Sequence, residues 1–201
     1  MAVKTARYGV AVLALLLSGC AAIPGFGPRP VDAYDLRVPP PSSQGPRISR
    51  AQLLVPEPAA IALFDGENIA IRRADGALQV LRGARWSDRL PRLVQDELVK
   101  AYQQSGRVGG VGRPGEGLAI DYQIIVDIRA FEVRVGSGSD HAHVELFVRI
   151  LDDRNGTVRA SRGFAASVPI TGEGSQALVA ALDQAFGLVT NQIVDWSLGV
   201  I

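Results

Sequence analysis

The stretch YQIIVDIRAFEVRVG (residues 122–136) predicts a single long strand. Its apolar positions are Tyr122, Ile124, Val126 and Ile128, followed by Phe131, Val133 and Val135. Within each set the residues recur at every second position, as expected for one face of a strand. The two sets have opposite parity, so we predict a bulge or a sharp twist near Arg129, where the buried face changes.

Two more strand-like segments follow, HVELFVRILD (143–152) and TVRASRGFAASV (157–168). They are separated by Asn155-Gly156, a strong signal for a tight hairpin turn. Residues 122–168 are therefore predicted to form a three-stranded antiparallel meander.

Helical spacing appears on both sides of this meander. The apolar positions in SDRLPRLVQDELVKAYQQSG (87–106) are Leu90, Leu93, Val94, Leu98, Ala101 and Tyr102. Those in GSQALVAALDQAFGLVTNQIVDWSL (174–198) are Leu178, Ala181, Leu182, Ala185, Val189, Ile193 and Trp196. Spacings of three and four indicate amphipathic helices. We predict Ser87 or Asp88 as the N-cap of the first helix, Gly106 as its end, and Ser175 as the N-cap of the second.

The first half of the chain contains shorter elements. Strands are predicted at Tyr34–Val38 and Ala51–Val55, and a hairpin over residues 68–81 turns at Asp75-Gly76. The Gly-rich run 106–117 follows a helix and lacks a Gly-Lys-Ser/Thr ending, so it does not fit a phosphate-binding loop and is interpreted as a flexible loop. The fold class predicted is α+β: a two-layer domain with a mainly antiparallel sheet and two amphipathic helices on one face.

The N-terminal segment has the features of an export signal. Lys4 and Arg7 precede an apolar run, Val10–Leu17, that is too short to cross a membrane. Ser18 and Gly19 then lead to Cys20, the only cysteine in the chain. The sequence Leu-Ser-Gly-Cys resembles a bacterial lipobox. An ordinary secretory signal with a chance cysteine is the alternative.

The lipobox resemblance implies cleavage between Gly19 and Cys20, with residues 1–19 as signal peptide. It also implies a diacylglycerol and an N-acyl chain on Cys20. In the sorting rule for lipoproteins of bacteria with two membranes, aspartate after the cysteine favours retention in the inner membrane. Ala21 leaves export to the outer membrane open, and the inner membrane is the alternative.

A proline-rich segment follows. Seven of the twelve prolines fall between Pro24 and Pro46. Because proline favours extended chain, residues 20–33 are interpreted as the lipidated cysteine and its tether, and residues 34–201 as the folded domain.

Composition argues against several functions. Removing Lys4 and Arg7 with the signal leaves 19 basic and 20 acidic residues, so no charge excess points to nucleic acid. His141, His143 and Glu145 share one face of a strand and could bind zinc or iron. No third histidine or free cysteine accompanies them after lipidation, so we predict no metal site, no catalytic residues, no cofactor and no enzymatic activity.

Several features together resemble one known family. They are the lipobox, the proline-rich arm, Tyr-Asp-Leu at 34–36, the turn-rich segment 65–106 (DGENIAIRRADGALQVLRGARWSDRLPRLVQDELVKAYQQSG), the meander, and Val-Asp-Trp-Ser-Leu at 194–198. This pattern resembles the ABC-type transport auxiliary lipoproteins, which include the paraquat-inducible lipoprotein C group. The Gly-rich run 106–117 departs from that pattern.

The resemblance implies a lipoprotein on the periplasmic face of the outer membrane that works with an MCE-domain protein, an ABC permease and its ATPase. Such systems move lipids or other hydrophobic solutes between two membranes, and the lipoprotein acts as a docking and assembly part. A homo-oligomer is compatible with this role. The second hypothesis is a structural lipoprotein that assists assembly of an outer-membrane complex without a role in transport.

Overall fold

The computed structural model describes residues 31–136 and 138–201, and residues 31–201 make one compact unit. The predicted signal peptide, Cys20 and most of the tether lie outside the described residues. The strands are β1 (Asp32–Tyr34), β2 (Ile48–Leu54), β3 (Ala59–Ala60), β4 (Asn68–Arg73), β5 (Leu78–Trp86), β6 (Val108–Gly112), β7 (Tyr122–Val135), β8 (His141–Asp152) and β9 (Thr157–Pro169), and the helices are α2 (Leu90–Ser105) and α3 (Gly174–Val200).

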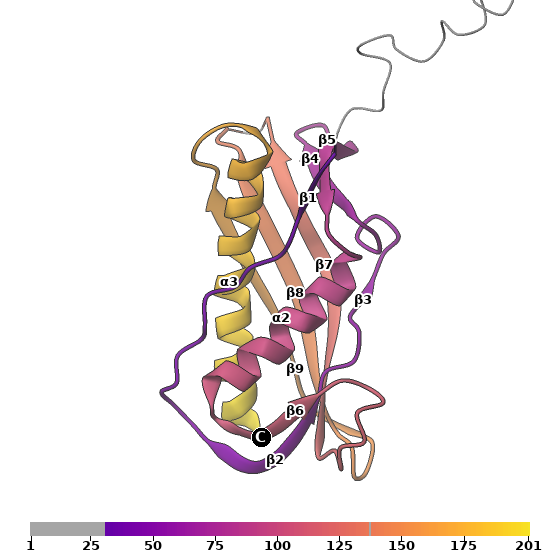
Figure 1. The fold of residues 1–201 in the computed structure, drawn as a ribbon, viewed down its shortest axis with the longest axis vertical. Coiled ribbons are helices and arrows are strands. Elements are labelled where there is room, and N and C mark those ends of the chain that lie inside the picture. Colours follow the sequence, from indigo (N-terminus) through magenta and orange to yellow (C-terminus); the bar gives the residue numbers. More distant parts are fainter. Residues whose placement is uncertain (1–30, 137) are drawn as a thin grey trace, which may run out of the picture. The chain divides into compact units, whose positions relative to one another are not determined.

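The α+β class is confirmed. Strands β7, β8 and β9 form the predicted antiparallel meander. Helices α2 and α3 both lie on one side of the sheet (Figure 1). One hydrophobic core joins the sheet to both helices, and Leu98 of α2 and Leu182 of α3 are fully buried in it.

The sheet is mixed rather than uniformly antiparallel. The edge of β7 that faces away from β8 is shared by three strands that follow one another along the chain. Parallel to β7, β2 pairs with its start, β3 with its middle and β4 with its end. A parallel pairing needs a long crossover, and the segment containing α2 provides it between β4 and β7.

The bulge predicted near Arg129 is confirmed. The β7–β8 register shifts between Ile128 and Ala130, which restores Phe131 and Val133 to the buried face. The Phe131 ring then packs edge-on against Trp86, with ring centroids 5.8 Å apart. The extra residue therefore keeps both halves of this long strand in the same core.

The prediction of a flexible loop over 106–117 is wrong for residues 108–112, which form β6 and pair in parallel with β2. Glycine is required because the two strands approach closely. A Cβ on Gly109 would lie 2.5 Å from the carbonyl oxygen of Ser49. A run of glycines carries no apolar alternation, so the strand leaves no periodic signal.

Helix positions and the end of the first helix at Gly106 agree with the prediction, but the predicted N-caps are wrong. Helix α2 has Pro91 in its first turn and ends at Gly106, which adopts the left-handed conformation at φ 60°. Its N-cap is Arg89, and that of α3 is Glu173; neither makes a side-chain capping hydrogen bond. At the start of α2, the backbone N–H groups of Ser87 and Leu90 donate to the carbonyl oxygens of Tyr34 and Gly66, which fixes the entry to this helix without a side-chain cap.

Helix α3 is long and apolar enough to cross a membrane, judged by length and composition. However, 56% of its most apolar window is buried inside the fold, where it packs on the meander. Its apolar character is therefore accounted for by the core.

The predicted strand Tyr34–Val38 is displaced. Strand β1 ends at Tyr34, and Asp32 and Ala33, assigned to the tether, pair with β5. Residues 35–46, which we call the strap, then cross the helices without regular structure (Figure 1). Leu36 of the strap is buried in the core, and Pro39 lies against Gly187 of α3.

A buried arginine holds the far end of the strap. The Arg107 side chain is fully buried; its Nε donates to the carbonyl oxygen of Pro46 at 3.0 Å and its Nη1 to Asp195 Oδ1 of α3 at 2.5 Å. A buried guanidinium needs such partners because an uncompensated charge is costly. Arg107 therefore ties the strap to α3.

Candidate interaction surfaces

The face of the sheet opposite the helices is polar and partly open. His141, His143 and Glu145 lie on this face of β8, as predicted from their spacing. Nε2 of His143 lies 4.0 Å from Glu145 Oε2, but the three side chains do not share one ligand point. Nδ1 of His143 lies 2.8 Å from Ser167 Oγ, whereas Nδ1 of His141 lies 3.1 Å from the carbonyl oxygen of Ser139. Within residues 31–136 and 138–201, no three His, Cys, Asp or Glu side chains are grouped so as to hold a metal ion.

A buried carboxylate beside His143 was not anticipated from the sequence. The Glu132 side chain has no exposed surface, and its Oε1 accepts hydrogen bonds from Arg72 at 2.6 Å and Arg134 at 3.0 Å. Burial raises the pKa of Glu132, but the two guanidinium groups lower it more strongly, so the net pKa lies below its ordinary value. The group is thus an ionised, ion-paired carboxylate.

The protonation state of His143 agrees with a structural role. Burial and the charge of Arg134 lower its pKa, so the ring is neutral at pH 7. The carboxylate and the imidazole therefore support the packing of side chains on this face.

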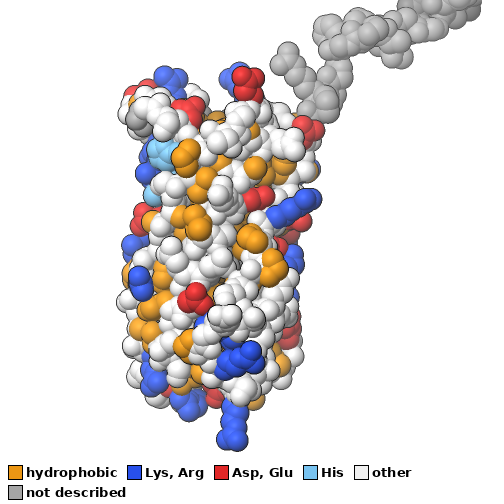
Figure 2. Space-filling view, turned by 90° about the vertical axis from the view of Figure 1, so that its left-hand side faces the viewer, with side chains coloured by type: hydrophobic (Ala, Val, Ile, Leu, Met, Phe, Trp, Pro, Cys, Tyr) orange, Lys and Arg blue, Asp and Glu red, His pale blue; other side chains and the backbone are white. Residues whose placement is uncertain are grey.

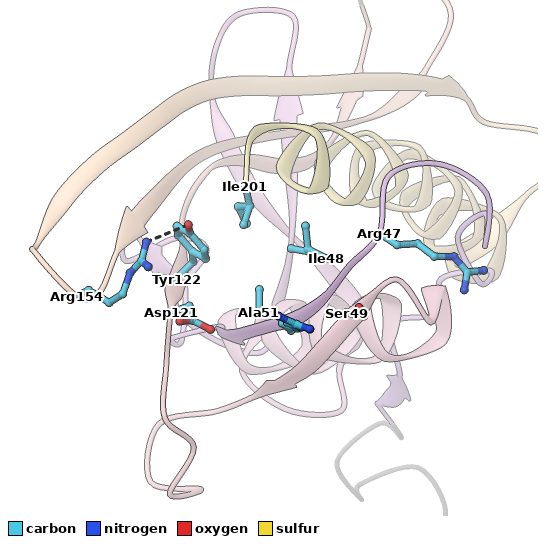
Figure 3. A pocket seen from close by; sticks show the side chains of 9 residues that line it. Arg47, Ile48, Ser49, Ala51, Asp121, Tyr122, Arg154 and Ile201 are labelled. Carbon is cyan, nitrogen blue, oxygen red and sulfur yellow. Dashed lines mark hydrogen bonds between the residues drawn. The ribbon is translucent and has the colours of Figure 1, made fainter.

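A shallow hollow of about 430 Å³ lies around Tyr122 (Figure 3). Ile48, Ala51 and Ile201 give it an apolar wall. Arg154 donates to the Tyr122 hydroxyl at 3.3 Å and is also paired with Asp152 at 2.8 Å. The side chain of Arg47 points away from Tyr122 (Figure 3). Arg47 and Arg154 therefore do not converge on a common anion site.

Charged side chains of both signs are spread over the side of the domain seen in Figure 2, with hydrophobic groups interspersed among them. Strand β9 pairs only with β8 among the described residues, so its second edge is open along the strand. Open strand edges are surfaces on which other chains add. The exposed side of the domain thus offers contact surfaces rather than an enclosed pocket.

A family model described as the ABC-type transport auxiliary lipoprotein component matches residues 34–194, nearly all of this folded unit. The chain belongs to this family. The sequence resemblance is thereby confirmed; the family is described as an auxiliary component of ABC-type transport and is not an enzyme family.

Solved structures agree with this assignment. This chain resembles protein XCC0632 from Xanthomonas campestris with 30% identity and a TM-score of 0.79, over 85% of this chain and 96% of that one. The hypothetical protein CT253 from Chlamydia trachomatis shares the fold at 9% identity and a TM-score of 0.53, over 75% of this chain and 97% of that one.

A curated relative, the uncharacterized protein bll6063 from Bradyrhizobium diazoefficiens, is 29% identical over 184 residues. The match covers 91% of this chain and 49% of the relative. The chain therefore spans about half the length of this relative.

Proposed function

We propose that this protein is anchored by a lipid on Cys20 to the periplasmic face of the outer membrane and docks a transport assembly there. The assembly consists of an MCE-domain protein, an ABC permease and its ATPase, and its cargo is a lipid or another hydrophobic solute. The observation that carries the proposal is the family match over residues 34–194. The lipobox-like segment that precedes this domain supports the anchoring.

The anchor suits a docking part. A diacylglycerol and an amide-linked acyl chain bury several hydrocarbon tails, at about 0.8 kcal/mol for each CH₂, which holds a protein stably on a membrane. The chain between Cys20 and Asp32 can span roughly 40 Å when extended. Because the anchor confines the domain within this radius, it raises the effective concentration of the domain for a partner that it binds only weakly.

The contact itself is assigned to the folded domain, on the open edge of β9. Arg159 and Arg162 of this strand have no ion-pair partner among the described residues, and the Ala165 side chain is exposed. An added strand would pair with the backbone of β9, and the two arginines favour an acidic partner segment. A lysine at Ala165 should hinder such pairing, as lysine does on natural edge strands.

A test uses a soluble form that begins after Cys20. It should bind the MCE-domain protein in vitro, because the contact lies on the folded domain, but it should fail to restore the membrane barrier in cells. Ala165→Lys should reduce binding, whereas Leu188→Lys, on exposed α3 surface, is the matched control. Full complementation by the soluble form would make the anchor dispensable and would refute this docking mechanism.

A crosslinking pull-down from detergent-solubilised membranes separates this function from its alternative. Recovery of the MCE protein and the permease supports transport. Recovery of an outer-membrane complex without them would favour the structural role in assembly.

A further inference from the structure

Exposed apolar side chains are unevenly distributed over the domain. Seven large hydrophobic residues in the described part of the chain are exposed: Val31, Ile61, Leu78, Val80, Leu118, Val158 and Leu188. Three of them, Val31, Leu78 and Val80, belong to β5 or directly precede β1, its partner. The remaining four are distributed over two loops, the start of β9 and the middle of α3. One sheet edge therefore carries a local excess of exposed apolar surface.

This edge projects beyond the core. No residue from Ile71 to Gly83, which covers the turn of the β4–β5 hairpin, is buried. Strand β5 pairs with β4 on one side, and β1 covers its other side only from Ala84 onward. Leu78 and Val80 are each 44% exposed and lie on the same face, two residues apart. The core does not require leucine or valine at these positions.

The charges next to these side chains favour an anionic surface. Arg82 lines a hollow with Val80, Ile71 and Gln79, and it has no ion-pair partner within the described residues. The neighbouring Arg73 is paired with Asp75 at 3.6 Å. An unpaired guanidinium next to exposed apolar groups matches the boundary between lipid headgroups and acyl chains.

The path of the chain brings this edge to the membrane. Asp32, the first residue of β1, pairs with Ala84, six residues from Leu78 on the same strand. At about 3.3 Å per residue, that is roughly 20 Å along β5. Cys20 precedes Asp32 by twelve residues, which reach roughly 40 Å at most. Figure 1 shows β1 beside the β4–β5 hairpin. A lipid on Cys20 therefore keeps the start of β1, and with it the β4–β5 hairpin, within reach of the bilayer.

We propose that the edge formed by Val31, Leu78, Val80 and Arg82, the β5 edge, rests on the phospholipid bilayer. Leu78 and Val80 enter the headgroup boundary, and the Arg82 guanidinium contacts lipid phosphate. The contact is weak by itself and is sustained because the anchor keeps the edge at high effective concentration. The inference rests on the anchoring of Cys20 proposed above, and it sets which side of the domain faces the membrane and which faces the partner.

The experiment uses the full lipidated protein in vesicles of mixed phosphatidylethanolamine and phosphatidylglycerol. Leu78→Cys is labelled with an environment-sensitive fluorophore, and Val158→Cys, an exposed valine at the start of β9, is the matched control. Because Cys20 is the only native cysteine, acylation leaves a single thiol for labelling. The label at residue 78 should be protected from an aqueous quencher at least about threefold more than the label at residue 158, as expected for entry into the interface.

A second variant tests the cause of this protection. Adding Val80→Asp to the labelled Leu78→Cys protein should abolish it, because a carboxylate at that depth is repelled by anionic lipid. Equal quenching at residues 78 and 158 would overturn the proposal. Protection at 78 only after the MCE protein is added would instead make the β5 edge a protein-docking surface. If each single-cysteine variant takes up two fluorophores, the thiol of Cys20 is free and therefore not acylated. That result would refute the lipid anchor of the proposed function, not the contact of the β5 edge with the bilayer.

Discussion

Asp183 of α3 is an acidic side chain whose charge is opposed by its surroundings. It faces the strap in a cleft with Tyr34, Asp35 and Arg37, and its Oδ1 accepts a hydrogen bond from the backbone N–H of Arg37 at 3.2 Å. Burial raises the pKa of Asp183 to about 6, and the hydrogen bond from Arg37 offsets only part of this effect. The nearby carboxylates of Glu97 and Asp35 also raise it.

This pKa predicts a pH-dependent stability. Since the pKa is higher in the folded protein than the ordinary 3.8, protonated Asp183 stabilises the fold below about pH 4, and this contribution is lost as the pH rises through about 6. Asp183→Asn should therefore become more stable relative to the wild type between pH 4 and pH 7. Urea midpoints measured across that range check the prediction. Asp32→Asn on exposed β1 is the control. If the urea midpoints of the wild type and of Asp183→Asn change in parallel with pH, the prediction is contradicted.

Cys20 provides a second prediction at the scale of one residue. Its position after Leu-Ser-Gly predicts that it carries the lipid. In cells labelled with palmitate, the Cys20→Ala protein should take up no label, whereas Cys20-containing protein should. Label persisting on Cys20→Ala would disprove lipidation at this site.

At the scale of elements, the two helices are held by side chains buried against the sheet. Leu98 and Leu182 have no exposed surface. Leu98→Ala or Leu182→Ala should lower the free energy of unfolding by about 2–5 kcal/mol, because each leaves a cavity. The matched control is Leu188→Ala, since Leu188 is 46% exposed on α3. Urea midpoints equal to wild type for the two buried sites would mean that these helix faces are misassigned.

The close pairing of β6 with β2 leads to another prediction. A methyl group at Gly109 would lie 2.5 Å from one backbone oxygen and 2.9 Å from another. Gly109→Ala should thus push the strands apart and lower stability by about 1–3 kcal/mol, the usual cost of overpacking. Gly199→Ala, near the end of α3 with open space around it, serves as control. The melting temperatures of the two variants test the prediction. A melting temperature of Gly109→Ala equal to that of the wild type would argue against the close contact between β6 and β2.

Elements with local periodicity were predictable from the sequence, and those without it were not. The meander, its bulge and both helices follow from the spacing of their own apolar side chains. Strand β6 is made of Val and Gly, and β3 is two residues long, so neither shows a period. The parallel pairings join segments distant in the chain, and no turn signal marks them. Glu132 is buried by Arg72 of another strand, a contact that a single segment cannot reveal.

At the scale of the whole molecule, one core serves every element. Residues from the strap, the sheet and both helices belong to the same hydrophobic cluster. We therefore expect the fragment 31–201 to unfold in a single cooperative transition. Urea unfolding followed by tryptophan fluorescence and by circular dichroism should give coincident midpoints, since Trp86 lies near β1 and Trp196 lies in α3. Two separate midpoints would show that the helices and the sheet are independent units.

The strap also has a mechanical consequence. Tension applied through the N-terminal chain acts first on β1, which is three residues long, and next on Leu36 and Pro39, before it reaches the carbonyl groups held by Arg107. Detaching residues 32–41, which precede the carbonyl groups held by Arg107, would release about 35 Å of extended chain. The domain could then move away from a membrane that pulls on it, with Arg107 as the point where the extension stops. The strap would thus supply additional tether when the distance between the two membranes increases. The chain would extend before the fold is strained.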